Sequence, residues 1–172
     1  MTRHGWHPGV LTVLLGLVVV GCGSTTPKTG TETTAAQATV PATTQASSYK
    51  VGDTVDTRQD LKITLHDWKL PAQGSSTYDT PPAGSKFGAA DVEACARTKA
   101  TSINPFRFTV QMADNRRIEH GIGGPRPSLN HTELQPDECV RGWVTFDVPD
   151  TGTPTYLVFT PYSGPGTKWS LS

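Results

Sequence analysis

The sequence predicts an all-β protein, an antiparallel β-sandwich of about seven or eight short strands. Apolar and polar residues alternate with period two in several windows between Thr54 and Leu171. Turn-forming pairs such as Gly52-Asp53, Pro81-Pro82 and Asp114-Asn115 separate these windows. No window has the apolar stripe and capping residues of a helix. Together these observations favour strands joined by tight turns.

Three windows predict half-buried strands most strongly, because each presents one apolar face. They are Leu61–Leu70, Pro105–Met112 and Val140–Val148. In the second window, Phe106 belongs to the predicted core-facing set with Phe108. Asp114-Asn115 predicts a hairpin after that strand, because asparagine tolerates positive φ. Further strands are predicted at Thr54–Arg58, Lys86–Ala94, Arg116–His120, Thr155–Tyr162 and Lys168–Leu171.

Residues 1–21 have the parts of a secretory signal peptide: Arg3 near the start, the apolar run Val10–Val20, and then Gly21. Cys22 follows directly, and Leu17–Cys22 is typical of a bacterial lipobox, in which this cysteine receives a diacylglyceryl thioether. An uncleaved membrane span would need about 20 apolar residues, more than this run supplies. An ordinary signal peptide cleaved nearby remains the alternative.

If Cys22 carries lipid, two or more acyl chains hold the protein on the membrane, at the extracytoplasmic face. Residues 22–48 then form a lipidated tether, because Gly23–Ser48 is rich in threonine, alanine and serine and contains no aromatic residue. Such a composition cannot repay the entropy of folding, which predicts a flexible linker. Residues 49–172 are long enough for one folded domain.

The overall charge is balanced, with 15 Lys and Arg against 15 Asp and Glu. Arg116-Arg117 is the one basic doublet, and acidic residues stand on either side of it. A protein that binds a polyanion usually has a basic patch, so nucleic acid is excluded as the expected partner.

Two cysteines, Cys95 and Cys139, remain beside Cys22. Outside the cytoplasm they are expected to pair as a structural disulfide. Two free thiols are the alternative. No C-x-x-C motif or histidine at zinc spacing accompanies them, so we expect no metal site.

Residues 49–172 resemble the actinobacterial lipoprotein domains grouped as domain of unknown function family 4352. The resemblance lies in Val51-Gly52-Asp53, Gly84–Cys95, Asn104-Pro105-Phe106 and, above all, Leu134–Pro149. It implies an immunoglobulin-like sandwich, a lipoprotein and a disulfide between Cys95 and Cys139. It implies no activity and therefore no catalytic residue. Asn115 stands where the family usually has glycine.

The remaining residues do not form a recognisable catalytic motif, so we expect neither an enzyme nor a cofactor. His66 and Asp67 are neighbours on one strand and point to opposite faces, which argues against a triad. Gly121–Gly124 is followed by Pro125-Arg126-Pro127, which forbids the helix that a phosphate-binding loop must open. His120 and His131 are interpreted as loop residues.

A binding surface is the remaining candidate. Pro71–Gly84 and Gly121–Asn130 are long loops, and long loops on a rigid scaffold often carry recognition. Trp68 and Trp143 are out of phase with the core-facing residues of their strands, and Arg126 lies in the second loop. These three residues are the candidate binding residues, unless the tryptophans are covered by loops.

We therefore expect a non-catalytic binding domain at the cell envelope, with an envelope protein or a wall component as partner. The alternative is a carrier of a small or lipidic ligand in an apolar cavity of the sandwich.

Overall fold

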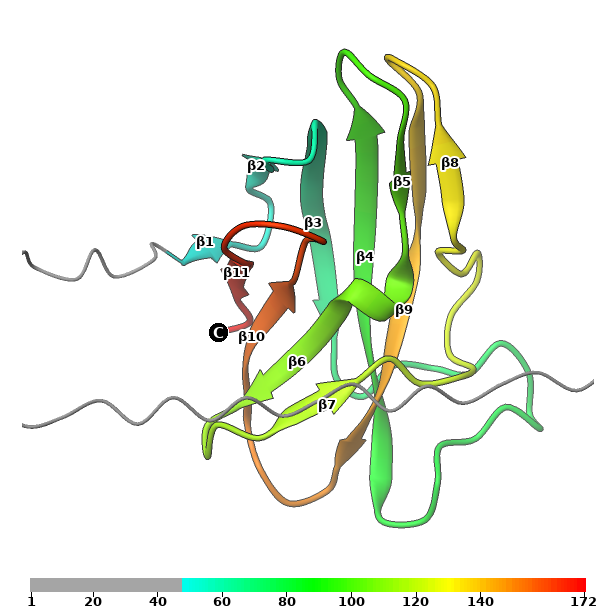
Figure 1. The fold of residues 1–172 in the computed structure, drawn as a ribbon. Coiled ribbons are helices and arrows are strands. Elements are labelled where there is room, and N and C mark those ends of the chain that lie inside the picture. The colour runs from blue at the N-terminus through cyan, green and yellow to red at the C-terminus, as the bar shows by residue number, and fades with distance from the viewer. Residues whose placement is uncertain (1–47) are drawn as a thin grey trace, which may run out of the picture. The chain divides into compact units, whose positions relative to one another are not determined.

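The structure, a computed structural model, describes residues 48–172. The predicted signal peptide, Cys22 and the linker up to residue 47 lie outside the described residues. In the described part the chain forms strands and a single short 3-10 helix (Figure 1). In chain order these are β1 (Tyr49–Lys50), β2 (Thr54–Asp56), β3 (Leu61–Lys69), β4 (Ser85–Ala96), β5 (Thr101–Ile103), η1 (Pro105–Arg107), β6 (Phe108–Met112), β7 (Arg117–Glu119), β8 (Thr132–Leu134), β9 (Cys139–Pro149), β10 (Pro154–Phe159) and β11 (Thr167–Ser170).

The strands form two main sheets, which confirms the predicted all-β sandwich. One sheet has the order β1-β11-β10-β6-β7, and the other has the order β2-β3-β4-β9. A third, small sheet pairs β5 with β8. All pairings are antiparallel except that of β1 with β11, which is parallel. Within residues 48–172 no helix is long and apolar enough to span a bilayer.

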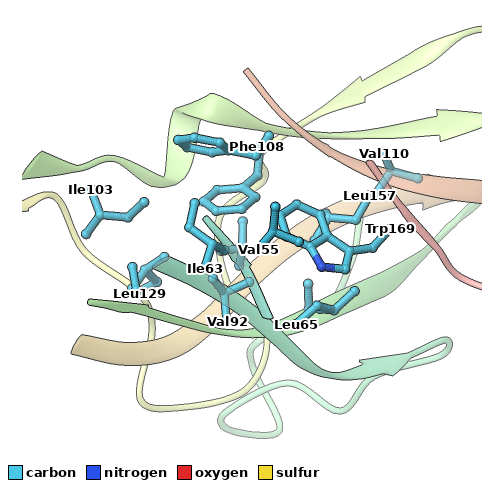
Figure 2. Packing of buried hydrophobic residues seen from close by; sticks show 14 of the residues in the cluster. Val55, Ile63, Leu65, Val92, Ile103, Phe108, Val110, Leu129, Leu157 and Trp169 are labelled. Atoms are coloured by element: carbon cyan, nitrogen blue, oxygen red, sulfur yellow. The ribbon is translucent and has the colours of Figure 1, made fainter. Parts of the chain in front are cut away.

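The hydrophobic core lies between the two main sheets. Ile63, Leu65 and Val92 from β3 and β4 lie close to Val110, Leu157 and Trp169 from β6, β10 and β11 (Figure 2), and all six side chains are fully buried. Each such side chain contributes about 1.5–3 kcal/mol relative to an exposed one. The alternation in the sequence arises from this burial on one face of each strand.

Trp68 lies on the core side of β3, and the prediction that it is out of phase with the core is wrong. The register with β4 shifts between Leu65 and Asp67, so that Trp68 stands opposite Ala90. A β-bulge inserts one extra residue and so reverses which side chains face inward. The Trp68 ring packs against the core cluster, with its centroid 6.2 Å from that of Phe146.

The prediction of a strand from Pro105 is also wrong in its first three residues, which form η1. The side chain of Asn104 accepts a hydrogen bond from the N–H of Phe106 at 3.0 Å and caps this helix. Pro105 takes the first helical position, for which its fixed φ is suited. As a result Phe106 is 72% exposed rather than in the core.

The hairpin predicted at Asp114-Asn115 joins β6 to β7, and Asn115 has a φ of 68°. Cys95 and Cys139 stand opposite each other at the ends of β4 and β9 and form the predicted disulfide. Three strands that the sequence did not indicate, β1, β5 and β8, have only two or three residues each, too few for a period to show.

Candidate functional site

A surface groove is the candidate site. It has a volume of about 290 Å³ and lies between η1, the loop that follows β7, and the middle of β9. We call it the β9 groove. Its lining residues are Pro105, Phe106, His120, Gly121, Ile122, Gly123, Arg126, Ser128, Leu129, Asn130, His131, Trp143 and Thr145.

The loop after β7 forms backbone hydrogen bonds with the outer edge of β9 near its two ends, and between them Gly124 packs against Thr145. Near its start, the N–H of Gly121 donates to the carbonyl of Thr145 at 2.8 Å. Near its end, the N–H of Leu129 donates to the carbonyl of Trp143 at 2.9 Å, and the N–H of Trp143 donates to Pro127 at 2.9 Å. Residues 122–126, between these anchors, make none of these edge bonds and form the rim.

Large apolar side chains stand exposed at this groove. Ile122 is 92% exposed and Phe106 is 72% exposed. The Phe106 ring lies edge-on to the imidazole of His120, with 4.9 Å between the ring centroids. Arg126 supplies a positive charge, while the lining residues include no carboxylate. The groove therefore offers apolar contacts together with one exposed arginine, whose charge lies near the Asp79 carboxylate at the rim.

His120 sits beside Asp147, the neighbour of Phe146 on β9. Burial lowers the pKa of His120 below 6.5, although the charge of Asp147 acts in the opposite direction. Burial likewise raises the pKa of Asp147 above 3.8, with His120 opposing that shift. Among the described residues, His120 Nδ1 and Asp147 Oδ1 are buried without a hydrogen-bond partner. The neutral imidazole is thus favoured at neutral pH.

Trp143 also faces the outer side of the β3-β4-β9 sheet. The ammonium of Lys69 lies 4.8 Å from the centre of its ring, in cation–π geometry. Opposite Trp143 in the sheet, Asp91 accepts two hydrogen bonds from Arg141, from Nε at 3.0 Å and from Nη2 at 2.7 Å. These pairs fix the surroundings of the indole.

Of the three candidate binding residues, the groove brings together Trp143 and Arg126. Trp68 is not among its lining residues, because the bulge in β3 turns that side chain into the core. Sequence reasoning missed Phe106 and Ile122 at this site. Ile122 did carry a signal, since a large aliphatic residue between glycines in a polar loop has no strand to join.

Comparison with known proteins places this fold and its sequence in one family. Residues 49–168 match the family described as "Domain of unknown function (DUF4352)", and the chain belongs to this family. No curated protein matches the sequence. The actinobacterial origin that the resemblance implied stays a prediction.

Three solved structures share the sandwich. The secreted protein MPT63 of Mycobacterium tuberculosis has a TM-score of 0.56 at 19% identity, over 74% of this chain and 98% of its own. The yjhA protein of Bacillus subtilis has a TM-score of 0.55 at 12% identity, over 72% and 99%. A candidate lipoprotein of Bacillus subtilis, ycdA, has a TM-score of 0.51 at 14% identity, over 70% and 38%. At these identities the likeness concerns the fold.

Proposed function

We propose that this protein is a lipid-anchored lipoprotein of the extracytoplasmic membrane face, whose β-sandwich binds an envelope protein or a wall component without catalysis. Cys22 and its lipobox support the anchor. The solved relatives, a secreted protein and a candidate lipoprotein, support the same side of the membrane. The β9 groove is the proposed binding site.

The exposure of Ile122 and Phe106 at the same groove is the observation that carries this proposal. Two large apolar side chains in water at one groove represent apolar area that only a partner would remove from solvent. Arg126 and Trp143, at the same groove, are residue types enriched among the energetically dominant positions of interfaces. The groove thus combines exposed apolar side chains with a positively charged one.

The lining residues fit binding better than catalysis. They include no cysteine, no carboxylate that could serve as a base and no other activated nucleophile. The carboxylate next to His120, that of Asp147, has a pKa raised by burial and does not line the groove. A ligand carrier would need an apolar cavity between the sheets. The β9 groove instead lies outside that layer, so it gives the carrier alternative no support.

Photo-cross-linking in intact cells tests the proposal. A photoreactive amino acid at position 122 of the full chain reports on whatever contacts the groove. The control position is Val51, which is also an exposed apolar residue but does not line the groove. We expect a discrete adduct from position 122 and none of the same mass from position 51.

A variant that removes the positive charge of Arg126 provides a second test in the same cross-linking experiment. Arg126→Ser should reduce the yield of the position-122 adduct severalfold, because it removes the one Lys or Arg charge among the lining residues. Arg117→Ser, at an exposed arginine on β7, is the matched control and should leave the yield unchanged. Equal adducts from positions 122 and 51, or equal effects of both arginine variants, would show that the groove is not the binding site.

A further inference from the structure

A second cluster of chemically active side chains lies away from the β9 groove, at the far end of the β4-β9 pair. Sγ of Cys95, Sγ of Cys139 and a carboxylate oxygen of Glu93 all lie within 4.8 Å of one another. Glu93 and Cys95 are two residues apart on β4, so they point to the same face of the sheet. In this structure the two sulfurs are joined as a disulfide, so they become possible ligands only when reduced. Two cysteine thiolates and a carboxylate are ligand types that zinc accepts.

The two sulfurs of the cluster border a surface hollow, whereas Glu93 is half-buried and does not line it. A hollow of about 390 Å³ is lined by both cysteines together with Lys62, Arg97 and Asp137. A small reductant and a metal ion can therefore reach the sulfurs without unfolding of the domain. This access sets the disulfide apart from one that is sealed in a core.

Two further side chains, His66 and Lys62, lie next to the carboxylate and to Cys95. His66 Nε2 lies 2.8 Å from Oε2 of Glu93, which fixes the orientation of that carboxylate. Lys62 stands opposite Cys95 in the sheet, and a cation beside a thiol favours the thiolate. A ligand held by a neighbour in this way resembles the outer-shell support of known metal sites.

We propose that the reduced domain binds one zinc-type divalent ion through Cys95, Cys139 and Glu93, with His66 as the positioning residue for Glu93. A thiol reductant opens the site: two equivalents of thiol give up two electrons and two protons to the disulfide and leave as their own disulfide. The ion then displaces the protons of the two cysteine thiols. A solvent molecule takes the fourth tetrahedral position.

Hydrogen bonds between β4 and β9 hold the two strands together on both sides of the disulfide, so we expect the pairing to persist when the disulfide is reduced. The β4-β9 pairing runs from Ser85 opposite Pro149 to Cys95 opposite Cys139. Beyond the cysteines it continues, because the N–H of Ala96 donates to the carbonyl of Glu138 at 2.9 Å and that of Asp137 donates to Ala96 at 3.1 Å. The two sulfurs therefore stay on adjacent strands when the bond between them is opened.

Cobalt(II) titration of residues 48–172 tests the site, because thiolate–cobalt bonds give a charge-transfer absorption that zinc lacks. This domain contains its complete hydrophobic core and excludes the thiol of Cys22. The reductant is removed under nitrogen before cobalt is added. We expect one cobalt per reduced domain with a thiolate spectrum, competed away by zinc, and no such spectrum from the oxidised domain. Far-UV circular dichroism monitors the fold.

Three variants distinguish the proposed metal ligands from the positioning residue. Cys139→Ser should abolish the two-thiolate spectrum, and Glu93→Gln should weaken cobalt binding and alter the ligand-field bands. His66→Ala should weaken binding about 10–100-fold and leave the thiolate spectrum unchanged, as expected of a positioning residue. The proposal is overturned if the reduced domain unfolds, if it stays folded without a thiolate–cobalt band, or if Glu93→Gln binds cobalt as the unaltered chain does.

Discussion

The carboxylate of Asp79 accepts a hydrogen bond from the N–H of Gly124 at 3.0 Å, across 45 residues of sequence. The same carboxylate accepts two more from Ser75, from its N–H at 2.7 Å and its hydroxyl at 2.9 Å. One side chain thus joins Pro71–Gly84, its own loop, to the loop that forms the rim of the β9 groove. These hydrogen bonds favour the charged form and lower the pKa of Asp79 below 3.8.

Replacing this carboxylate should loosen the groove rim. We expect Asp79→Ala to increase the hydrogen-exchange rate of the Gly124 amide severalfold, because that N–H loses its acceptor. Asp114→Ala is the control: Asp114 is another aspartate with a lowered pKa, but it is exposed and its partner is Arg116 in the β6-β7 turn. Equal exchange at Gly124 in both variants would contradict a bracing role for Asp79.

The bracing contact should also depend on pH in a defined direction. Because the pKa of Asp79 is lower in the folded chain than the ordinary 3.8, its stabilisation is complete above that value. It is lost as the pH falls through the folded-state pKa. We expect Gly124 protection to be constant from neutral pH down to about pH 5 and to fall only in stronger acid, as NMR-detected exchange would show.

His120 should make the domain less stable in mild acid. Its pKa is lower in the folded chain than the ordinary 6.5, so the unfolded chain binds the proton more strongly. The free energy of unfolding should be level above about pH 6.5 and decrease as the pH falls toward the folded-state pKa. Asp147, whose pKa is raised, acts the other way: its stabilising contribution is present below 3.8 and lost as pH rises through its folded-state pKa.

Urea unfolding at several pH values measures this slope. His120→Gln should flatten the decrease between about pH 6.5 and pH 5.5, because the variant lacks the histidine whose pKa is lower in the folded chain than in the unfolded chain. His131→Gln, which changes an exposed histidine at the same groove, should retain the slope. A slope that survives His120→Gln unchanged would assign the acid sensitivity to other groups.

Gly88 should not tolerate a side chain while Trp68 lies across it. A Cβ at position 88 would lie 2.6 Å from Cη2 of Trp68 and 2.8 Å from Cγ2 of Val148. Gly88→Ala should therefore cost about 1–3 kcal/mol of unfolding free energy through overpacking. In a Trp68→Leu background the cost should be smaller by at least about 0.5 kcal/mol, a coupling that denaturant unfolding of the four proteins resolves. If the changes in unfolding free energy of the two single variants simply added up in the double variant, the Trp68 ring would not be what excludes a side chain at position 88.

Cys22 should determine membrane attachment. Cys22→Ala removes the acceptor thiol, so the product should leave the membrane fraction and lack the mass of the acyl chains. Cell fractionation with intact-mass measurement checks both. A product that stays attached and processed as before would show that another element holds this protein.

The long strands could be predicted because burial of one face of a strand makes apolar and polar residues alternate along the sequence. Leu61, Ile63 and Leu65 are all fully buried, as the alternation indicates. The hairpin at Asp114-Asn115 and the pairing of Cys95 with Cys139 were also predictable, since both depend on local turn chemistry or on the number of cysteines. Trp68 and Phe106 were misplaced because a bulge and a capped 3-10 turn interrupt the period without a strong local signature.

By itself, then, the sequence determined a β-sandwich with one disulfide, through apolar alternation, turn residues and the number of cysteines, while export remains a prediction from the lipobox. The tertiary structure alone decided which side chains meet at the β9 groove and around the disulfide. One groove contains Phe106, Ile122 and Trp143, because the loop after β7 forms hydrogen bonds with the edge of β9. Such contacts depend on the register between distant segments, and a period of two along one strand contains no information about that register.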